Sequence, residues 1–137
     1  MNDAKQGGME LNMLITHLHF NGDCADAIAL YEKAFNTKAE DYDFRDNKIA
    51  HAEIKIHGQI IWLNDAKEFI KSGYGIDGSA HLVLTFDTPE ELLACYEYFK
   101  TDENDAPVPF HEAPYSKLSG SFMDKFGILW AFMVVSE

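Results

Sequence analysis

The spacing of apolar residues in the first half of the chain predicts a strand, a helix and then three strands. Residues 13–20 (MLITHLHF) alternate as a half-buried strand does. After an N-capping turn at 21–23, residues 24–35 carry apolar side chains at intervals of three and four residues, which predicts a helix. Three strand patterns follow: residues 38–45, and then residues 49–56 and 59–63 on either side of a His57-Gly58 turn.

The second half of the chain repeats this order. Residues 80–86 (AHLVLTF) alternate as a strand, and Thr88 before Pro89 is a typical helix start. The following residues predict a helix over 90–100. Three further strand patterns end the chain, over residues 108–115, 117–123 and 128–135.

Short sequence matches align the two halves. His17-Leu18 matches His81-Leu82, and Tyr31-Glu32 matches Tyr96-Glu97 with one residue more between the two points. Gly58 precedes Ile-Ile-Trp-Leu much as Gly127 precedes Ile-Leu-Trp-Ala-Phe. We therefore expect an α+β fold of two βαβββ modules, whose curved mixed sheet surrounds a cavity.

These boundaries predict a single domain over residues 12–137, after a flexible N-terminal leader at 1–11. Within the domain, module 1 covers about 12–64 and module 2 about 80–137, and a linker over 65–79 joins them.

Composition excludes several classes of partner. The chain has 23 acidic and 11 basic residues, and its net charge of −12 disfavours nucleic acid and anionic membrane surfaces. No apolar run approaches the ~20 residues that span a bilayer. The polar N-terminus lacks the pattern of a signal peptide. Cys24 and Cys95 lie far apart, so we expect buried free thiols and a cytoplasmic protein.

Strand alternation selects the candidate site residues. Leu18 and Phe20 share one face of their strand, so His17 points to the other, and the same alternation places His81 opposite Leu82. A third histidine, His51, has the parity of Glu53 on the hairpin. Each of these side chains could bind a metal, transfer a proton or only line a polar wall.

The two tryptophans have different expectations. Trp62 could stack on a flat ligand or fill the cavity, and both remain open. Trp130 has the opposite parity to Ala131, so we expect it to pack in the core.

Four segments carry a family resemblance: HFNGDCADAIALYEKAF, HAEIKIHGQIIWLND, AHLVLTFDTPEELLACYEYF and GSFMDKFGILWAF. They resemble the vicinal oxygen chelate superfamily of glyoxalases, bleomycin-resistance proteins and dioxygenases, and its PhnB-like subgroup in particular. The resemblance implies two βαβββ modules and a homodimer. It also implies, for metal-using members, histidine or glutamine and glutamate ligands on the first and last strands of each module.

The match to that ligand set is incomplete. His81 stands at the histidine position of module 2, and His17 is its counterpart, although counting from the helix tyrosine puts Thr16 there. The two carboxylate positions hold Trp62 and Ala131, which cannot bind a metal.

We therefore predict a glyoxalase-related protein that binds a small molecule without an intact four-ligand metal site, and assign it no cofactor. The predicted ligand-binding residues are His17, His51, Glu53, Trp62 and His81. The alternative is a divergent metal-dependent lyase, isomerase or dioxygenase that uses Zn, Mn, Ni or Fe on His17, His81 and a substitute carboxylate such as Glu53.

Overall fold

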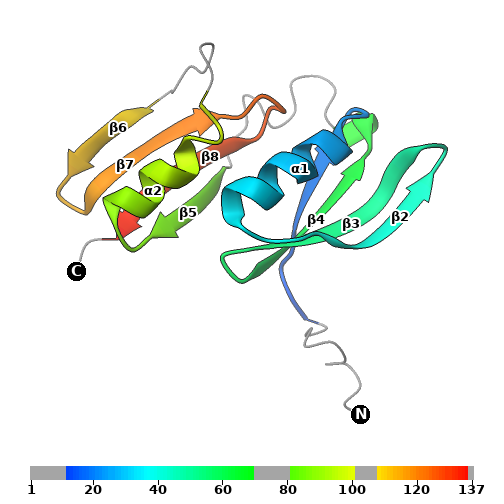
Figure 1. Cartoon of the computed structure of the whole chain (residues 1–137), viewed down its shortest axis with the longest axis horizontal. Helices are drawn as coiled ribbons and strands as arrows, with labels where there is room; N and C mark the ends of the chain where they lie inside the picture. Colours follow the sequence, from blue (N-terminus) through cyan, green and yellow to red (C-terminus); the bar gives the residue numbers. More distant parts are fainter. Residues whose placement is uncertain (1–11, 70–80, 101–107, 136–137) are drawn as a thin grey trace.

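Two sheets with the same strand order form the molecule, a computed structural model that describes residues 12–69, 81–100 and 108–135 (Figure 1). The first contains β1 (Thr16–Phe20), β2 (Glu40–Arg45), β3 (Lys48–Ile56) and β4 (Gln59–Asp65), with helix α1 (Cys24–Phe35) and the 3₁₀ turn η2 (Lys67–Phe69). The second contains β5 (Leu82–Phe86), β6 (Val108–Ala113), β7 (Ser116–Met123) and β8 (Leu129–Val135), with helix α2 (Pro89–Tyr96).

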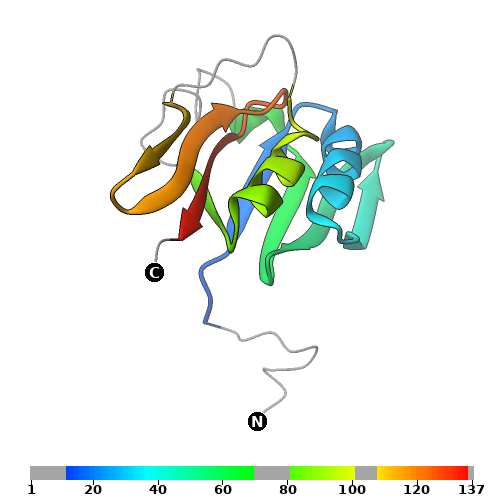
Figure 2. The same cartoon turned by 60° about the vertical axis from the view of Figure 1, so that its left-hand side comes forward.

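Both sheets are mixed, and their topologies correspond strand by strand. The orders are β1-β4-β3-β2 and β5-β8-β7-β6. In each sheet the first strand runs parallel to the last, and the other pairs are antiparallel. The two helices cover the same side of the sheets, so the opposite side carries no helix (Figures 1 and 2). The predicted α+β class of two strand-helix-three-strand units is confirmed.

Helix α1 begins and ends with different kinds of contact. Its predicted N-capping turn exists, but the side chain of Asp23 makes no capping hydrogen bond. Asp65, at the end of β4, accepts hydrogen bonds from the backbone N–H groups of Gly22 and Cys24 instead. A carboxylate brought in by the fold thus supplies what a local residue usually supplies. At the other end, Asn36 adopts the left-handed conformation, with φ of 52°.

Helix α2 is shorter than its sequence pattern predicts. Thr88 accepts a hydrogen bond from the backbone N–H of Glu91, as expected for the residue before Pro89. The helix ends at Tyr96 rather than near residue 100. The backbone N–H of Phe99 bonds to the carbonyl of Tyr96, three residues back, which is the tighter spacing of a 3₁₀ turn. This tighter turn accompanies the burial of the Phe99 side chain.

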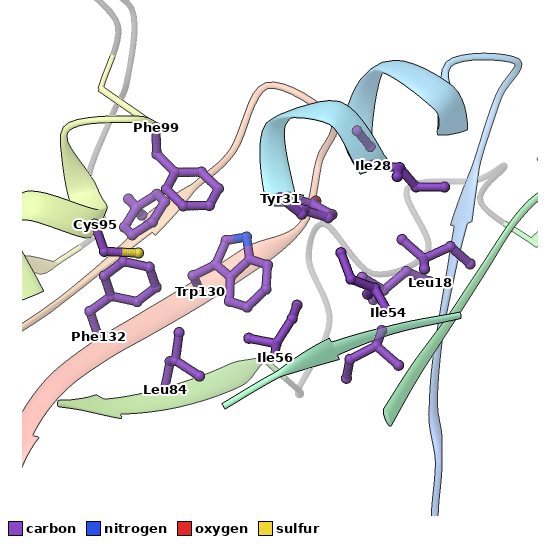
Figure 3. Close-up of a cluster of buried hydrophobic side chains, with 14 of the residues drawn as sticks. Leu18, Ile28, Tyr31, Ile54, Ile56, Leu84, Cys95, Phe99, Trp130 and Phe132 are labelled. Atoms are coloured by element: carbon purple, nitrogen blue, oxygen red, sulfur yellow. The ribbon is translucent and has the colours of Figure 1, made fainter. Parts of the chain in front are cut away.

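Trp130 occupies the centre of the core and joins the two modules (Figure 3). Its side chain is 2% exposed, which confirms the predicted core position. The ring lies 5.7 Å from that of Tyr31 and 5.4 Å from that of Phe35, both on α1. From the second module it meets Phe99 at 6.0 Å. A continuous aromatic cluster therefore holds the modules together.

A buried carboxylate adds a polar link to this aromatic cluster. Asp124 accepts hydrogen bonds from the Tyr31 hydroxyl at 2.6 Å and from Trp130 Nε1 at 2.9 Å. The backbone N–H groups of Phe126 and Ile128 bond to its other oxygen. Burial raises the pKa of Asp124, while these four hydrogen bonds act in the opposite direction.

Both cysteines are free and buried, as predicted, and burial raises the pKa of each thiol to about 12. Among the described residues, no helix is long and apolar enough to cross a membrane. The leader at 1–11 and most of the linker lie outside the described residues.

Candidate functional site

The side of the first sheet that carries no helix holds polar and aromatic side chains from three neighbouring strands, β1, β4 and β3. The parallel pairing of β1 with β4 sets His17 beside Trp62 and His19 beside Asn64. The β3–β4 hairpin then sets Glu53 beside Trp62. We name this surface the histidine face; its members are His17, His19, His51, Glu53, Trp62 and Asn64.

Trp62 lies at the centre of the histidine face. The His17 ring meets it edge to face at 5.8 Å, and the His51 ring does so at 5.2 Å. The His17 and His19 rings are themselves 4.3 Å apart. The structure therefore brings together four of the five predicted site residues, since Glu53 contacts His51.

Two of the histidines are held by side-chain hydrogen bonds. His51 Nε2 donates to Glu53 Oε2 at 3.2 Å, and His19 Nδ1 donates to Asn64 Oδ1 at 2.7 Å. Each bond fixes a tautomer and a ring orientation. The prediction included neither His19 nor Asn64. Strand parity placed His19 on the correct face, whereas Asn64 joins it only through the pairing of β1 with β4.

The indole N–H of Trp62 is buried, and within the described residues it has no hydrogen-bond partner. Leaving such a donor unsatisfied costs about 1–3 kcal/mol. Two histidine rings, those of His17 and His51, contact the ring that carries this N–H. A ligand atom that accepts this hydrogen bond would remove the cost.

The environment of His17 favours its neutral form. Partial burial lowers the pKa of His17, and the neighbouring His19 and His51 lower it further. A neutral imidazole can donate a hydrogen bond from one nitrogen and accept at the other.

The second sheet carries different side chains at the corresponding positions. Thr16 pairs with Ile61, three residues after Gly58, and Leu82 pairs with Trp130, three residues after Gly127. This register makes Val83 the counterpart of His17. The sequence match that paired His17 with His81 is therefore shifted by two residues.

An even shift preserves strand parity, so His81 still shares the parity of Val83. His81 is exposed, and in the described part of the chain no hydrogen bond or ring contact joins it to His17. The counterparts of Trp62 and Glu53 are Ala131 and Ser121. The histidine face is thus a property of the first module.

A cavity of about 270 Å³ lies between the two sheets, next to the histidine face. We name it the seam cavity. Its wall is part polar and part apolar, and it combines the end of the β3–β4 hairpin with β5. Its lining residues are Leu14, Thr16, Ile56, His57, Gln59, Ile60, Ile61, Leu82, Val83, Leu84, Thr85 and Trp130.

The described residues do not fit the metal site that the family resemblance implies. Across 12–69, 81–100 and 108–135, no three His, Cys, Asp or Glu side chains converge in a way that could hold an ion. His51 and Glu53 are bonded to each other, and His81 lies apart from His17. The described residues of the face offer hydrogen-bond donors and imidazole groups beside the seam cavity.

Comparisons with known proteins agree with this fold. A sequence profile for the Glyoxalase/Bleomycin resistance protein/Dioxygenase superfamily matches residues 14–132. Protein YjdN of Escherichia coli (strain K12) is 27% identical over 145 residues, covering 90% of this chain and 96% of its own.

Two solved structures have closely similar folds. One is described as a putative 3-demethylubiquinone-9 3-methyltransferase, PhnB protein, from Bacillus cereus: TM-score 0.77, 21% identity, 90% of this chain and 100% of that chain. The other is protein PA1353 from Pseudomonas aeruginosa: TM-score 0.74, 19% identity, 92% and 99% covered.

Proposed function

Because the chain belongs to the Glyoxalase/Bleomycin resistance protein/Dioxygenase superfamily, we propose that it binds a small molecule on the histidine face. His17 and Trp62 contact the ligand directly in this proposal. The pair of His51 and Glu53 orients an imidazole toward it. His81 shares the parity of Val83, which lines the seam cavity, and in this proposal it contacts the far end of the ligand.

The observation that carries this proposal is the unpartnered indole N–H of Trp62. A buried donor without a partner is costly, and a ligand atom that reached it would supply the missing acceptor. The adjoining cavity has a wall that is part polar and part apolar, and small-molecule sites combine apolar contact area with a few directed polar groups.

A second candidate function is a divergent metal-dependent enzyme. The hydrogen-bonded pair of His51 and Glu53, beside His17, favours it, because imidazole and carboxylate groups are common metal ligands. This function requires Glu53 to leave His51, and His81 to approach from the second module.

Nuclear magnetic resonance can test both functions, because the two tryptophans report separately. In ¹⁵N-labelled protein, we titrate a set of small oxygen-containing aromatic and aliphatic compounds and follow the indole N–H signals. We expect at least one compound to move the Trp62 signal in a saturable manner. The Trp130 signal serves as an internal control, since its N–H donates to buried Asp124 and should stay in place.

The variant Trp62→Phe identifies the Trp62 signal and should abolish the response while leaving the Trp130 signal unchanged. If none of the compounds moves the Trp62 signal, binding at the histidine face is wrong. Addition of Zn²⁺ after dialysis against a chelator tests the second function. Stoichiometric broadening or shifts at His17 and His81, lost in His81→Ala, would support the metal-dependent enzyme against the metal-free binding protein.

A further inference from the structure

Donors and acids are separated across the histidine face. The β1 and β4 strands contribute His17, His19, Trp62 and Asn64 to it, and no acidic residue. Glu53 on β3 is the acid beside Trp62, and Glu40 and Asp43, paired to β3 from β2, lie farther toward the other edge. Among them, Glu53 is already engaged by His51. The end of the face at β1 and β4 therefore presents mainly hydrogen-bond donors and imidazoles.

The same end of the face adjoins the seam cavity. Ile60 lines the cavity and lies two residues before Trp62 on the same side of β4, which is roughly 7 Å along the strand. Val83 and Thr85 line it from β5. A cavity of about 270 Å³ is slightly below the usual range of about 300–1,000 Å³ for ligand pockets, so it suits the body of a small ligand.

We propose that the ligand of the histidine face is a small monocarboxylic acid. Its carboxylate accepts a hydrogen bond from Trp62 Nε1 and pairs with a protonated His17, and the rest of the molecule enters the seam cavity past Ile60. This inference rests on the proposed function and narrows it to one chemical class. A carboxylate matches the donor-rich end of the face because it carries acceptors only.

Binding of such an anion should take up a proton. In the free protein, burial and two neighbouring imidazoles oppose a charge on His17. An adjacent carboxylate favours the charged form and raises the pKa of His17 in the complex. The groups that also face this site are His19, His51, Glu53, Glu40, Asp43 and the exposed Lys55, which is paired with Ile60.

The test compares acids with their neutral amides at the Trp62 indole signal of the full chain. Benzoate and hexanoate are titrated against benzamide and hexanamide at pH 6 and pH 8. We expect at least one acid to bind at least tenfold more tightly than its amide at pH 6. Where one proton is taken up, affinity should fall by about tenfold per pH unit as His17 loses its charge.

Three variants separate the named contacts from general charge effects. His17→Asn and Trp62→Phe should each weaken the acid at least tenfold and remove most of the preference for acid over amide. His111→Asn is the matched control, since His111 is exposed on the second sheet and bonds to the carbonyl of Pro109. Lys55→Gln should leave the affinity within about twofold, because Lys55 takes no part in the proposed contact.

The possible failures differ from those of the proposed function. If amides bind as well as acids, or if neither acid moves the Trp62 signal while other compounds do, the carboxylate proposal is wrong and small-molecule binding stands. A loss of binding in Lys55→Gln but not in His17→Asn would overturn the assignment of the cation. If no compound moves the signal, both proposals fall.

Discussion

The two tryptophans differ in whether the indole N–H has a hydrogen-bond partner. Trp130 Nε1 donates to buried Asp124, and the ring is a fixed part of the core. Trp62 has a comparable ring on the opposite side of its sheet, but its buried N–H has no partner among the described residues. One indole N–H is therefore satisfied within the core, while the other lacks an acceptor among the described residues.

At the residue scale, Tyr31→Phe should destabilise the protein more at neutral pH than at acid pH. The hydroxyl bonds to a buried carboxylate, so its loss should cost about 2 kcal/mol near pH 7.5. Burial raises the folded-state pKa of Asp124 above its ordinary value of 3.8, and the Tyr31 bond opposes that rise. Removing the bond raises the folded-state pKa of Asp124 further. The free energy of unfolding of Tyr31→Phe therefore decreases more than that of the wild type as pH rises through this folded-state pKa.

Urea unfolding at pH 4.5 and pH 7.5 measures this effect. The stability difference between the wild type and Tyr31→Phe should be larger at pH 7.5. Tyr98→Phe, at a side chain that is 53% exposed, is the control and should change little at either pH. An equal deficit at both pH values would show that the hydroxyl does not act through the charge on Asp124.

At the scale of elements, the edge of the second sheet depends on one glycine. Gly120 on β7 lies beneath Phe110 of the neighbouring strand β6. An added Cβ would come within 2.8 Å of Phe110 Cδ1, 2.9 Å of Phe110 Cα and 2.9 Å of the Val108 carbonyl oxygen. Two of these three atoms belong to the backbone and cannot rotate away. The β6–β7 pair thus requires a residue without a side chain at this position.

Gly120→Ala should therefore destabilise the protein by about 2 kcal/mol, as overpacking in a core does. Urea unfolding gives the value. Gly58→Ala is a useful comparison, because an added Cβ there meets nothing within 4 Å and only the positive φ of 82° opposes it. If Phe110→Leu restores the stability of Gly120→Ala, the side chain rather than the backbone is the obstacle, contrary to our expectation.

At the scale of the whole molecule, the two modules share a topology but have different open faces. The first sheet presents the histidine face. The second presents small, hydroxyl and apolar residues at the matching positions, including Val83 at 53% exposure and, at the end of β8, Val135 at 52%. The two open faces therefore differ: the first carries histidines and a carboxylate, and the second carries small, hydroxyl and apolar side chains.

We expect a homodimer, as the family resemblance implies, because exposed apolar side chains on an uncovered sheet face are typical of surfaces that bind a partner. Light scattering coupled to size-exclusion chromatography should give twice the mass of one chain. Val83→Lys together with Val135→Lys should shift the mass toward one chain if this face is the interface. A monomer at high protein concentration would contradict the prediction.

Local spacing determined much of the fold. Alternation placed His17, His51 and Glu53 on the side of the sheet away from the core, and it placed Trp130 inside. Helical periodicity predicted α1 over its full observed length. These features depend on side-chain direction within one element, which neighbouring residues set.

Tertiary structure decided which elements meet. The pairing of β1 with β4 joins His19 to Asn64 across 45 residues, and the hydrogen-bond register aligns His17 with Val83 rather than with His81. The seam cavity also arises only when the two modules are packed, because residues of both line it. Alternation determines the face of a strand but not its partner or register, because every even shift preserves the same face.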